Sequence, residues 1–397
     1  MLAELGAEVM GIEKSKVEII LSKLKKEIMH VIDNKMLRPV RRFRLKKKCD
    51  SLIKLTSNYD LKSAEEQLRD YHACGEVAFS QDAILDAEFD LMIVIPVYNV
   101  EPFLEECIQS VINQQTSYSY VAYFVDDGST DRSSEILERH FGDRHIRIIH
   151  QKNGGLSAAR NRAIEHILGR YVLFLDSDDY LAPNAVDVMM RAADEFDADL
   201  VEGGHVMFED NRQLASVKYG YQVKKSMLNE ITGYPWGKLL KGTLLKHNCF
   251  PIGLWYEDTV IKTLICPECE TIVTVPEVTY YYRQNPKGIS KKHADKRCVD
   301  TYWITKLYLE EKFRRGHFLG KEEYTQFLKQ LCTNQRRVKE LPIEIQEGIF
   351  ALSCALREKY FSDINLTDDF RLSMLSEAVR GKSFVAFLEI ISEWNNL

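Results

Sequence analysis

Short apolar runs alternate with helix-like segments through the middle of this chain, and this alternation restricts the fold more than any other feature. The runs are Leu91–Pro96, Tyr120–Val125, His145–His150 and Tyr171–Leu175. Each run suits one strand buried on both faces, and each is followed by turn residues or by a segment with helical spacing. This alternation predicts an α/β fold, with ligands held at the carboxyl ends of the strands.

Two regions flank the central part of the 397-residue chain. We predict an N-terminal helical, basic extension at residues 1–88, a central domain at 89–295 and a C-terminal helical region at 296–397. Apolar residues recur at helical spacing from about residue 12 to 33, which predicts an amphipathic helix. The C-terminal region is rich in leucine, lysine and glutamate, a composition that favours helices.

A basic cluster follows the amphipathic segment. Between residues 38 and 48 the chain carries seven arginines and lysines and no acid. We hypothesise that residues 12–48 contact an anionic membrane surface through apolar and charged side chains together. The alternative is a helix packed on the central domain with a solvated basic flank. The basic residues are Arg38, Arg41, Arg42, Arg44, Lys46, Lys47 and Lys48.

Composition narrows the class of protein. The 53 lysines and arginines against 59 aspartates and glutamates give a net charge of −6, too mild for a nucleic-acid-binding protein. Nine scattered cysteines and no secretory signal at the start predict a reduced, cytoplasmic environment. No apolar run approaches the roughly 18 residues of a membrane span. Cys266 and Cys269 lack the second pair that a structural zinc site needs.

The strongest local signal is an apolar strand that ends in acids. Tyr171–Leu175 is followed directly by Asp176, Ser177, Asp178 and Asp179. Carboxylates two residues apart on an extended chain point to the same side, where they repel each other unless a cation joins them. Oxygen ligands suit Mg²⁺ or Mn²⁺, and such an ion would also bridge a diphosphate. The alternative is a solvated acidic loop without function.

Two other strand ends carry candidate nucleotide contacts. The first strand ends in Pro96, Val97 and Tyr98, against which a base could lie. The second ends in Asp126, whose carboxylate could accept a hydrogen bond from the imide N–H of uracil. Plain turns and a helix cap are the alternatives at these places.

A glycine pair opens a small-residue helix after the third strand. Asn153 and Gly154 precede it, and a helix N-terminus suits an anionic ligand. Arg160, about two turns into the helix, reaches either a phosphate or the loop carboxylates. Neither the dinucleotide-binding glycine pattern nor a P-loop is present, so dehydrogenase and ATPase functions lose support.

Adjacent acids at Glu257 and Asp258 open a later helix-like stretch. A carboxylate within reach of an acceptor hydroxyl can take its proton as that hydroxyl attacks. We assign Asp258 as the candidate general base and Glu257 as the second choice. Capping of the helix is the structural alternative.

Taken in order and spacing, these motifs resemble family 2 glycosyltransferases of the GT-A fold. The resemblance covers roughly Leu91–Ser290, about half of the chain. It is especially close to bacterial enzymes that build capsular, cell-wall or exopolysaccharide glycans or that glycosylate surface adhesins. It implies a Rossmann-like mixed sheet with helices on both faces, a nucleotide-sugar half at 89–215 and an acceptor half at 216–295.

The resemblance also implies roles for individual residues. Asp176 and Asp178 would hold Mn²⁺ or Mg²⁺, with Asp178 the direct ligand, and Asp258 would be the base of an inverting transfer. The donor would be a nucleotide sugar, UDP-sugars being favoured, and the acceptor a glycan or a glycosylated lipid or protein. The implied nucleotide-sugar contacts are Pro96, Val97, Tyr98, Asp126, Asn153, Gly154, Arg160, Asp176 and Ser177.

The acceptor side is described less completely by the motifs. Trp236 and Trp255 are candidate acceptor contacts, although aromatic side chains serve equally well as core. Tyr280–Arg283 resembles the family element near the diphosphate. The family often has asparagine where Gly237 stands here, which leaves acceptor contacts there open.

Two other functions remain as alternatives. A sugar nucleotidyltransferase of similar fold would usually open with a glycine- and arginine-rich phosphate loop, which the start of this domain lacks. A non-catalytic sugar- or nucleotide-binding module would not need the acids at positions 176, 178 and 258, all of which are present.

Overall fold

The computed structural model describes residues 38–54, 59–75, 77–79, 83–209, 212–224, 231–285, 294–366 and 369–393. The chain divides into two compact units. The sheet unit comprises residues 67–318 and 337–341, and the helical unit comprises residues 1–66, 319–336 and 342–397. Helix α4 (Leu61–Tyr71) and helix α12 (Lys321–Val338) each contribute residues to both units.

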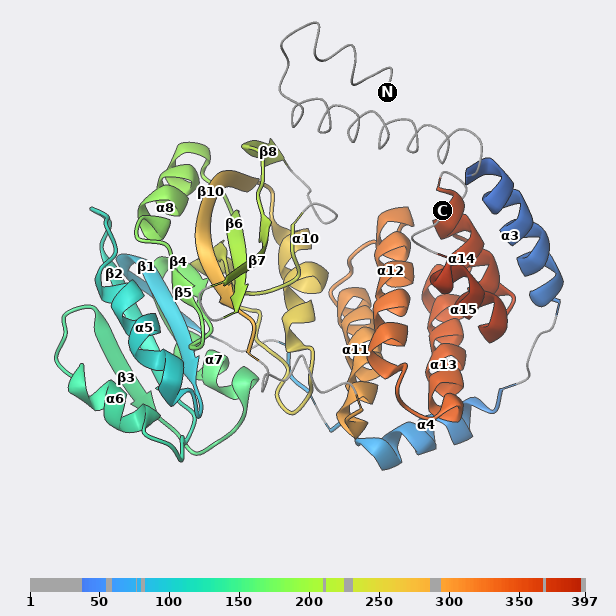
Figure 1. Ribbon diagram of the computed structural model, residues 1–397, viewed down its shortest axis with the longest axis horizontal. Helices are drawn as coiled ribbons and strands as arrows, with labels where there is room; N and C mark the ends of the chain where they lie inside the picture. The colour runs from blue at the N-terminus through green and yellow to red at the C-terminus, as the bar shows by residue number, and fades with distance from the viewer. Residues whose placement is uncertain are drawn as a thin grey trace, which may run out of the picture. The chain divides into compact units, whose positions relative to one another are not determined.

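A ten-stranded mixed sheet forms the sheet unit, in the order β3-β2-β1-β4-β9-β6-β10-β5, with β7 beside β6 and β8 beside β10 (Figure 1). Strands β1 to β4 pair in parallel, whereas β9 runs antiparallel to both of its neighbours, β4 and β6. The strands are β1 (Ile84–Val97), β2 (Tyr120–Asp126), β3 (Ile146–His150), β4 (His166–Phe174), β5 (Tyr180–Leu181), β6 (Leu200–Glu209), β7 (Arg212–Val217), β8 (Gln222–Lys224), β9 (Lys238–Lys241) and β10 (Ile272–Arg283).

The α/β fold predicted from the sequence is confirmed. The four apolar runs lie in strands β1 to β4 except for His145 and Leu175, which flank β3 and β4, and β1 begins at Ile84, ahead of the run that predicted it. Alternation within β1 separates two apolar layers. Leu91, Ile93 and Ile95 pack with α5 (Glu101–Ile112) and α8 (Ala185–Phe196) in one core. Helix α7 (Leu156–Ile164) also contacts β1, β2 and β4 and lies outside that core cluster, so helices cover both faces of the sheet.

The remaining helices of the sheet unit are short or lie near its end. They are α6 (Ser133–Arg139), α9 (Gly242–Leu245), α10 (Cys266–Glu268) and α11 (Asp300–Arg314). The 3-10 segments are Glu257–Thr259 and Lys296–Val299, and Ile261–Ile265 is a π-helical turn. The candidate base Asp258 lies in the first 3-10 segment, shortly before the π-helical turn.

The helical unit confirms the prediction of a helical C-terminal region. It contains α3 (Arg38–Leu52), α13 (Ile343–Phe361), α14 (Phe370–Arg380) and α15 (Phe384–Ser392), together with most of α12. Helix α3 buries Leu45 and Cys49 and contacts α14 and α15. The amphipathic helix predicted near residues 12–33 lies outside the described residues. The boundaries predicted at 88/89, 215/216 and 295/296 stay predictions.

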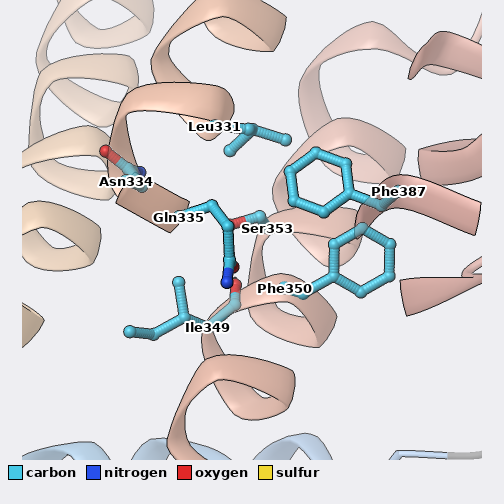
Figure 2. A pocket seen from close by; sticks show the side chains of 7 residues that line it. All are labelled: Leu331, Asn334, Gln335, Ile349, Phe350, Ser353 and Phe387. Atoms are coloured by element: carbon cyan, nitrogen blue, oxygen red, sulfur yellow. The ribbon is translucent and has the colours of Figure 1, made fainter. Parts of the chain in front are cut away.

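A small cavity lies between α12, α13 and α15 within the helical unit (Figure 2). Its volume is about 10 Å³, roughly the space that one water molecule needs. It is therefore a packing defect and too small for a substrate. Its lining residues are Leu331, Asn334, Gln335, Ile349, Phe350, Ser353 and Phe387.

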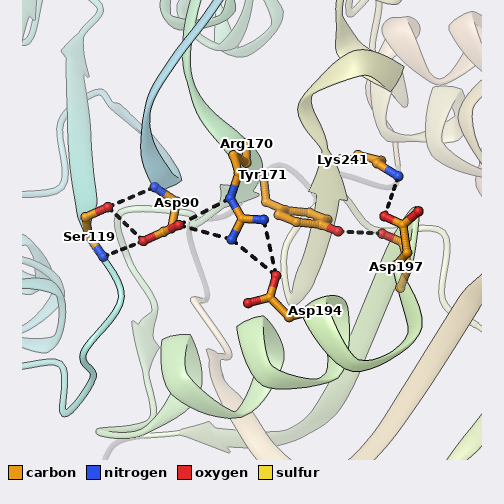
Figure 3. Close-up of polar contacts among 8 residues, drawn as sticks. Asp90, Ser119, Arg170, Tyr171, Asp194, Asp197 and Lys241 are labelled. Atoms are coloured by element: carbon orange, nitrogen blue, oxygen red, sulfur yellow. Dashed lines mark hydrogen bonds and ion pairs between the residues drawn. The ribbon is translucent and has the colours of Figure 1, made fainter.

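Polar contacts join the strands at the edge of the sheet where β1 and β4 begin their buried runs (Figure 3). Arg170 Nη2 lies 3.0 Å from Asp90 Oδ1 and 3.2 Å from Asp194 Oδ1, which links β4 to β1 and α8. Asp90 in turn accepts a hydrogen bond of 2.9 Å from Ser119 N–H. These side chains are partly exposed, so each pair contributes little stability, on the order of 0–1 kcal/mol.

Gly169 provides a test of how closely β1 and β4 approach. A Cβ atom at this position would lie 2.3 Å from Tyr171 O and 2.4 Å from Met92 N, both backbone atoms. We expect Gly169→Ala to lower the free energy of unfolding by about 3 kcal/mol, because the two strands must move apart. Urea denaturation followed by tryptophan fluorescence measures the loss.

Gly75→Ala is the control for the Gly169 variant. Among the described residues, no heavy atom lies within 4 Å of a Cβ built at Gly75. This variant should unfold at the urea concentration of the wild type. Equal midpoints for the two variants would contradict the close approach.

Candidate active site

Hydrogen bonds join the loops that follow strands β1 and β2 at the carboxyl edge of the sheet. Asn99, directly after β1, has a left-handed backbone with φ 51°, a conformation that asparagine tolerates better than most residues. Its Oδ1 accepts a hydrogen bond of 2.8 Å from Thr130 N–H. Asp131 Oδ2 accepts one of 3.0 Å from Glu101 N–H at the start of α5. The two loops are thereby held in one arrangement beside Tyr98, which is 48% exposed.

Asp126, the predicted base contact, is buried at the end of β2. Its Oδ1 accepts a hydrogen bond of 2.9 Å from Ser129 N–H, and its Oδ2 lies 3.0 Å from His150 Nδ1. Burial opposes ionisation, but the hydrogen bonds from Ser129 and His150 outweigh it and lower the pKa of Asp126. Both oxygens therefore have partners in the protein, and the contact with uracil stays a prediction.

Asp127 orders the glycine loop, a role that sequence reasoning missed. Its Oδ1 accepts from Gly154 N–H at 2.8 Å and from the Gln151 side chain at 2.8 Å, and its Oδ2 accepts from Gly155 N–H at 2.7 Å. The loop donors nearest α7 are thus already occupied by a carboxylate. Asn153 and Gly154 are exposed beside them.

Arg160 joins two of the predicted acids. Its side chain is 2% exposed, and it places Nη2 2.8 Å from Asp176 Oδ1 and Nη1 2.9 Å from Glu257 Oε1. Burial disfavours the charged guanidinium, but the charges of Asp176 and Glu257 more than compensate and raise its pKa. Of the two roles predicted for Arg160, the geometry provides the fixing of loop carboxylates.

The acids after β4 fall into two groups. Asp179 is buried and accepts hydrogen bonds of 2.7 Å from Tyr280 Oη and 2.7 Å from Arg283 N–H. It therefore ties the loop to β10. Asp176 and Asp178 remain half-buried, with buried Ser177 between them. Burial, and then the charge of Asp176, raise the pKa of Asp178, although Asn285 Nδ2 donates to it at 3.2 Å.

The donor set of Asp176 and Asp178 fits a hard divalent cation. Both side chains offer oxygen only, and burial followed by the negative charge of Asp176 raises the pKa of Asp178, so that a cation there would be favoured. Within the described part of the chain, no group of three or more His, Cys, Asp or Glu side chains is arranged around a common metal position. Further ligands would have to come from substrate oxygens or water.

Glu257 and Asp258 lie together in the 3-10 segment Glu257–Thr259. Burial raises the pKa of both carboxyl groups, against the opposing charges of Arg160 and Arg337. Glu257 is held in its ion pair with Arg160, whereas no side chain among the described residues forms an ion pair with Asp258. Asp258 is therefore the acid left available for a proton transfer.

The two predicted acceptor tryptophans have different surroundings. Trp236 is 4% exposed, and its ring stacks on Tyr280 at 4.6 Å and on Tyr282 at 5.0 Å between centroids. It belongs to the core, a position that does not favour acceptor contact. Trp255 is half-buried and lies 5.1 Å below the Arg297 guanidinium. Both acceptor roles stay predictions.

Comparison with known proteins agrees with the resemblance seen in the motifs. Residues 92–252 match the sequence model described as "Glycosyl transferase family 2". The uncharacterized glycosyltransferase EpsJ of Bacillus subtilis is 33% identical over 215 residues, which are 50% of this chain and 62% of EpsJ. The glycosyltransferase GlyA of Streptococcus pneumoniae is 30% identical over 52% of this chain and 32% of its own length.

A further relative and a solved structure complete the comparison. The minor teichoic acid biosynthesis protein GgaB of Bacillus subtilis is 29% identical over 52% of this chain and 24% of its own length. The chain thus spans less than two thirds of EpsJ, GlyA and GgaB. The structure of S. aureus TarS residues 1–349 in complex with UDP-GlcNAc superposes with a TM-score of 0.52 and 20% identity, over 77% of this chain and 91% of that 1–349 fragment. This likeness confirms the GT-A fold.

The bridging position of Arg160 leads to a stability prediction. Arg160→Met should lower the free energy of unfolding by about 3 kcal/mol, because it leaves Asp176 and Glu257 partly buried without their cation. Urea unfolding at pH 7 measures the change.

Arg162→Met, two residues along α7, is the matched control. Arg162 is half exposed, and among the residues that the structure describes its one ion pair is with exposed Glu165. Its replacement should therefore change the free energy of unfolding by less than about 0.5 kcal/mol. If the two variants lost equal stability, Arg160 would not have the bridging role.

Proposed function

Residues 92–252 form a glycosyl transferase family 2 domain, and from this premise we propose that the chain transfers a sugar from a nucleotide diphosphate donor to an acceptor hydroxyl. The observation that carries the proposal is the Arg160 bridge. It joins the loop after β4, which carries the candidate metal ligands Asp176 and Asp178, to the segment that bears the candidate base. A donor held at the first place and an acceptor held at the second would meet at the same edge of the sheet.

The donor is a UDP-sugar in this proposal. Its base lies against the end of β1 near Tyr98, and the carboxylate of Asp126 reads the uracil imide N–H. Asp126 already holds His150, so uracil would share or displace that hydrogen bond. The other predicted contacts with the nucleotide sugar are Pro96, Val97, Asn153, Gly154 and Ser177.

Asp176 and Asp178 would hold Mn²⁺ or Mg²⁺. When bound, the cation supplies positive charge against the leaving diphosphate. The two carboxylates would leave such a cation open to phosphate oxygens and water. Arg160 keeps Asp176 in place and limits the repulsion between the acids before donor and cation arrive.

Asp258 takes the proton of the attacking hydroxyl. A buried carboxylate with a raised pKa is a stronger base than an exposed aspartate, which suits proton transfer near neutral pH. One base and one displacement give inversion at the anomeric carbon. Glu257 serves as the anchor of the segment because its carboxylate is committed to Arg160.

One relative supports a class of acceptor. GgaB is named a minor teichoic acid biosynthesis protein, and we propose a bacterial surface glycan, or a glycosylated lipid or protein, as the acceptor of this chain. A nucleotidyltransferase of the same fold would instead consume a nucleoside triphosphate and a sugar phosphate. A non-catalytic binding module would bind donor without turnover.

Turnover of nucleotide sugars tests the proposal. A panel of UDP-, GDP- and TDP-sugars with Mn²⁺, assayed for release of the nucleoside diphosphate, should show hydrolysis or transfer with UDP-sugars. We expect Asp258→Asn to lower kcat by roughly 100-fold or more, because the proton acceptor is lost. Thermal protection by UDP should persist in this variant.

The controls separate the base from the metal. Asp197→Asn, at an exposed aspartate that pairs with Lys241, should have the turnover of the wild type. Chelation should abolish turnover and Mn²⁺ should restore it, whereas Asp178→Asn should stay inactive at any Mn²⁺ concentration. Near-normal turnover of Asp258→Asn would place the base elsewhere, and turnover that survives chelation would exclude the metal role.

We also propose peripheral contact of the protein with the cytoplasmic face of the membrane. None of the described helices has the length and apolar character of a membrane span. Helix α3 turns Leu45 and Cys49 inward and leaves Phe43 72% exposed. Exposed arginines and lysines surround Phe43 on the same helix, and this combination of apolar and positive side chains suits an anionic lipid surface.

Vesicle flotation tests the membrane contact. The triple variant Arg44→Gln, Lys46→Gln and Lys47→Gln should bind phosphatidylserine-containing vesicles on the order of 100-fold more weakly, since each charge contributes about 1 kcal/mol. The control triple Lys321→Gln, Lys329→Gln and Arg336→Gln removes the same charge from exposed positions of α12 and should bind like the wild type. If both triple variants floated with the vesicles to the same extent, the basic residues of α3 would be a solvated flank and not a membrane contact. The same conclusion would follow if the wild-type protein floated equally with vesicles that lack phosphatidylserine.

A further inference from the structure

Arg337, at the end of α12, lies over Tyr256, the residue before the candidate base segment. Its guanidinium carbon is 3.6 Å from the centroid of the Tyr256 ring, the distance of a close stack. Its Nη1 donates a hydrogen bond of 3.1 Å to Thr301 Oγ1 in α11. The arginine is thus held between the ring and α11, which fixes its position.

Tyr256 has an unusual backbone. Its φ is +68°, the left-handed region, which is uncommon for a bulky residue and costs on the order of 1 kcal/mol or more. This residue immediately precedes the segment Glu257–Thr259. The left-handed turn therefore sets the direction in which the chain presents Glu257 and Asp258.

Several contacts hold this strained turn, and two of them act directly on Glu257 and on the Tyr256 ring. Tyr308 Oη donates a hydrogen bond of 3.1 Å to Glu257 O, on the side that follows Tyr256. The Arg337 guanidinium holds the ring of Tyr256 itself. A strained residue persists when its surroundings fix it, and such residues gather at functional sites.

The positive charge of Arg337 also acts on the candidate base Asp258. Among the charges that act on Asp258, Arg337 has the largest effect, followed by Arg160 and by the opposing Asp176. In the other direction, Asp258 is the leading carboxylate that favours the charged form of Arg337. Arg160 thus forms the ion pair of Glu257, whereas the charge of Arg337 acts on Asp258 without an ion pair between them.

We propose that Arg337 is a positioning residue for the candidate base: it holds Tyr256 in the left-handed turn and so directs Asp258 toward the acceptor hydroxyl. This inference rests on the proposed function. It extends the site to α12, a region to which the sequence motifs assign no role. No step of the transfer uses Arg337 itself.

Three variants test the inference. Arg337→Gln removes the charge and the stack, Arg337→Lys keeps a charge over the ring, and Arg336→Gln removes the same charge from the exposed neighbouring residue. Their kcat and donor KM are measured with the UDP-sugar that the wild type hydrolyses best. Crystal structures of the wild type and Arg337→Gln report the φ of Tyr256 and the position of Asp258.

Arg337→Gln should lower kcat by about 10- to 100-fold with the donor KM within about twofold, the result of a misplaced base and an intact donor site. Arg337→Lys should recover part of the loss, and Arg336→Gln should match the wild type. In crystals of Arg337→Gln, Tyr256 should leave the left-handed region or Asp258 should shift.

Three results would overturn the inference. They are unchanged kcat in Arg337→Gln, a donor KM that rises as much as kcat falls, and an unmoved Tyr256–Asp258 segment in its crystals. If the wild type turns over no nucleotide sugar, the proposed function fails, and the crystal structures alone decide whether Arg337 positions the segment.

Discussion

The geometry of the site depends on one buried guanidinium. Arg160 can be buried in its charged form because Asp176 and Glu257 contact it at 2.8 and 2.9 Å. A buried charge without such partners would cost several kcal/mol. The acids come from a loop after β4 and from the 3-10 segment Glu257–Thr259, far apart in the sequence. The ion pairs therefore fix the distance between the donor side and the acceptor side of the proposed reaction.

Acidic residues follow the end of β4, and they differ in their surroundings. Asp179 accepts hydrogen bonds from Tyr280 Oη and Arg283 N–H, but burial and the charges of Asp178 and Asp176 still raise its pKa. Asp178 has a raised pKa because burial and Asp176 both oppose its ionisation. The protein thus retains unfavourable electrostatics at the place where the proposed cation and diphosphate bind, a common property of functional sites.

The sequence pattern predicted those parts of the fold and site that depend on residues close together in the chain. Apolar runs predicted β1 to β4, and acids placed directly after them had to lie at the carboxyl edge. The pattern predicted that Arg160 could contact the loop carboxylates, but it did not predict that Arg160 joins Asp176 to Glu257. It also missed the role of Asp127 in the glycine loop and the left-handed turn at Tyr256, because each depends on segments that meet only in the folded chain. Trp236 illustrates the same limit, since its stacking on Tyr280 and Tyr282 requires β10 beside it.

The composition of the helical unit has a consequence for biosynthesis. Helix α3 packs on α14 and α15, and Ser383 Oγ donates to Leu52 O across 331 residues of chain. During translation, α3 leaves the ribosome long before these partners exist, while the sheet unit is completed in between. Because domains fold as they emerge, α3 must wait with Leu45 and Cys49 uncovered until the last helices of the chain have been synthesised.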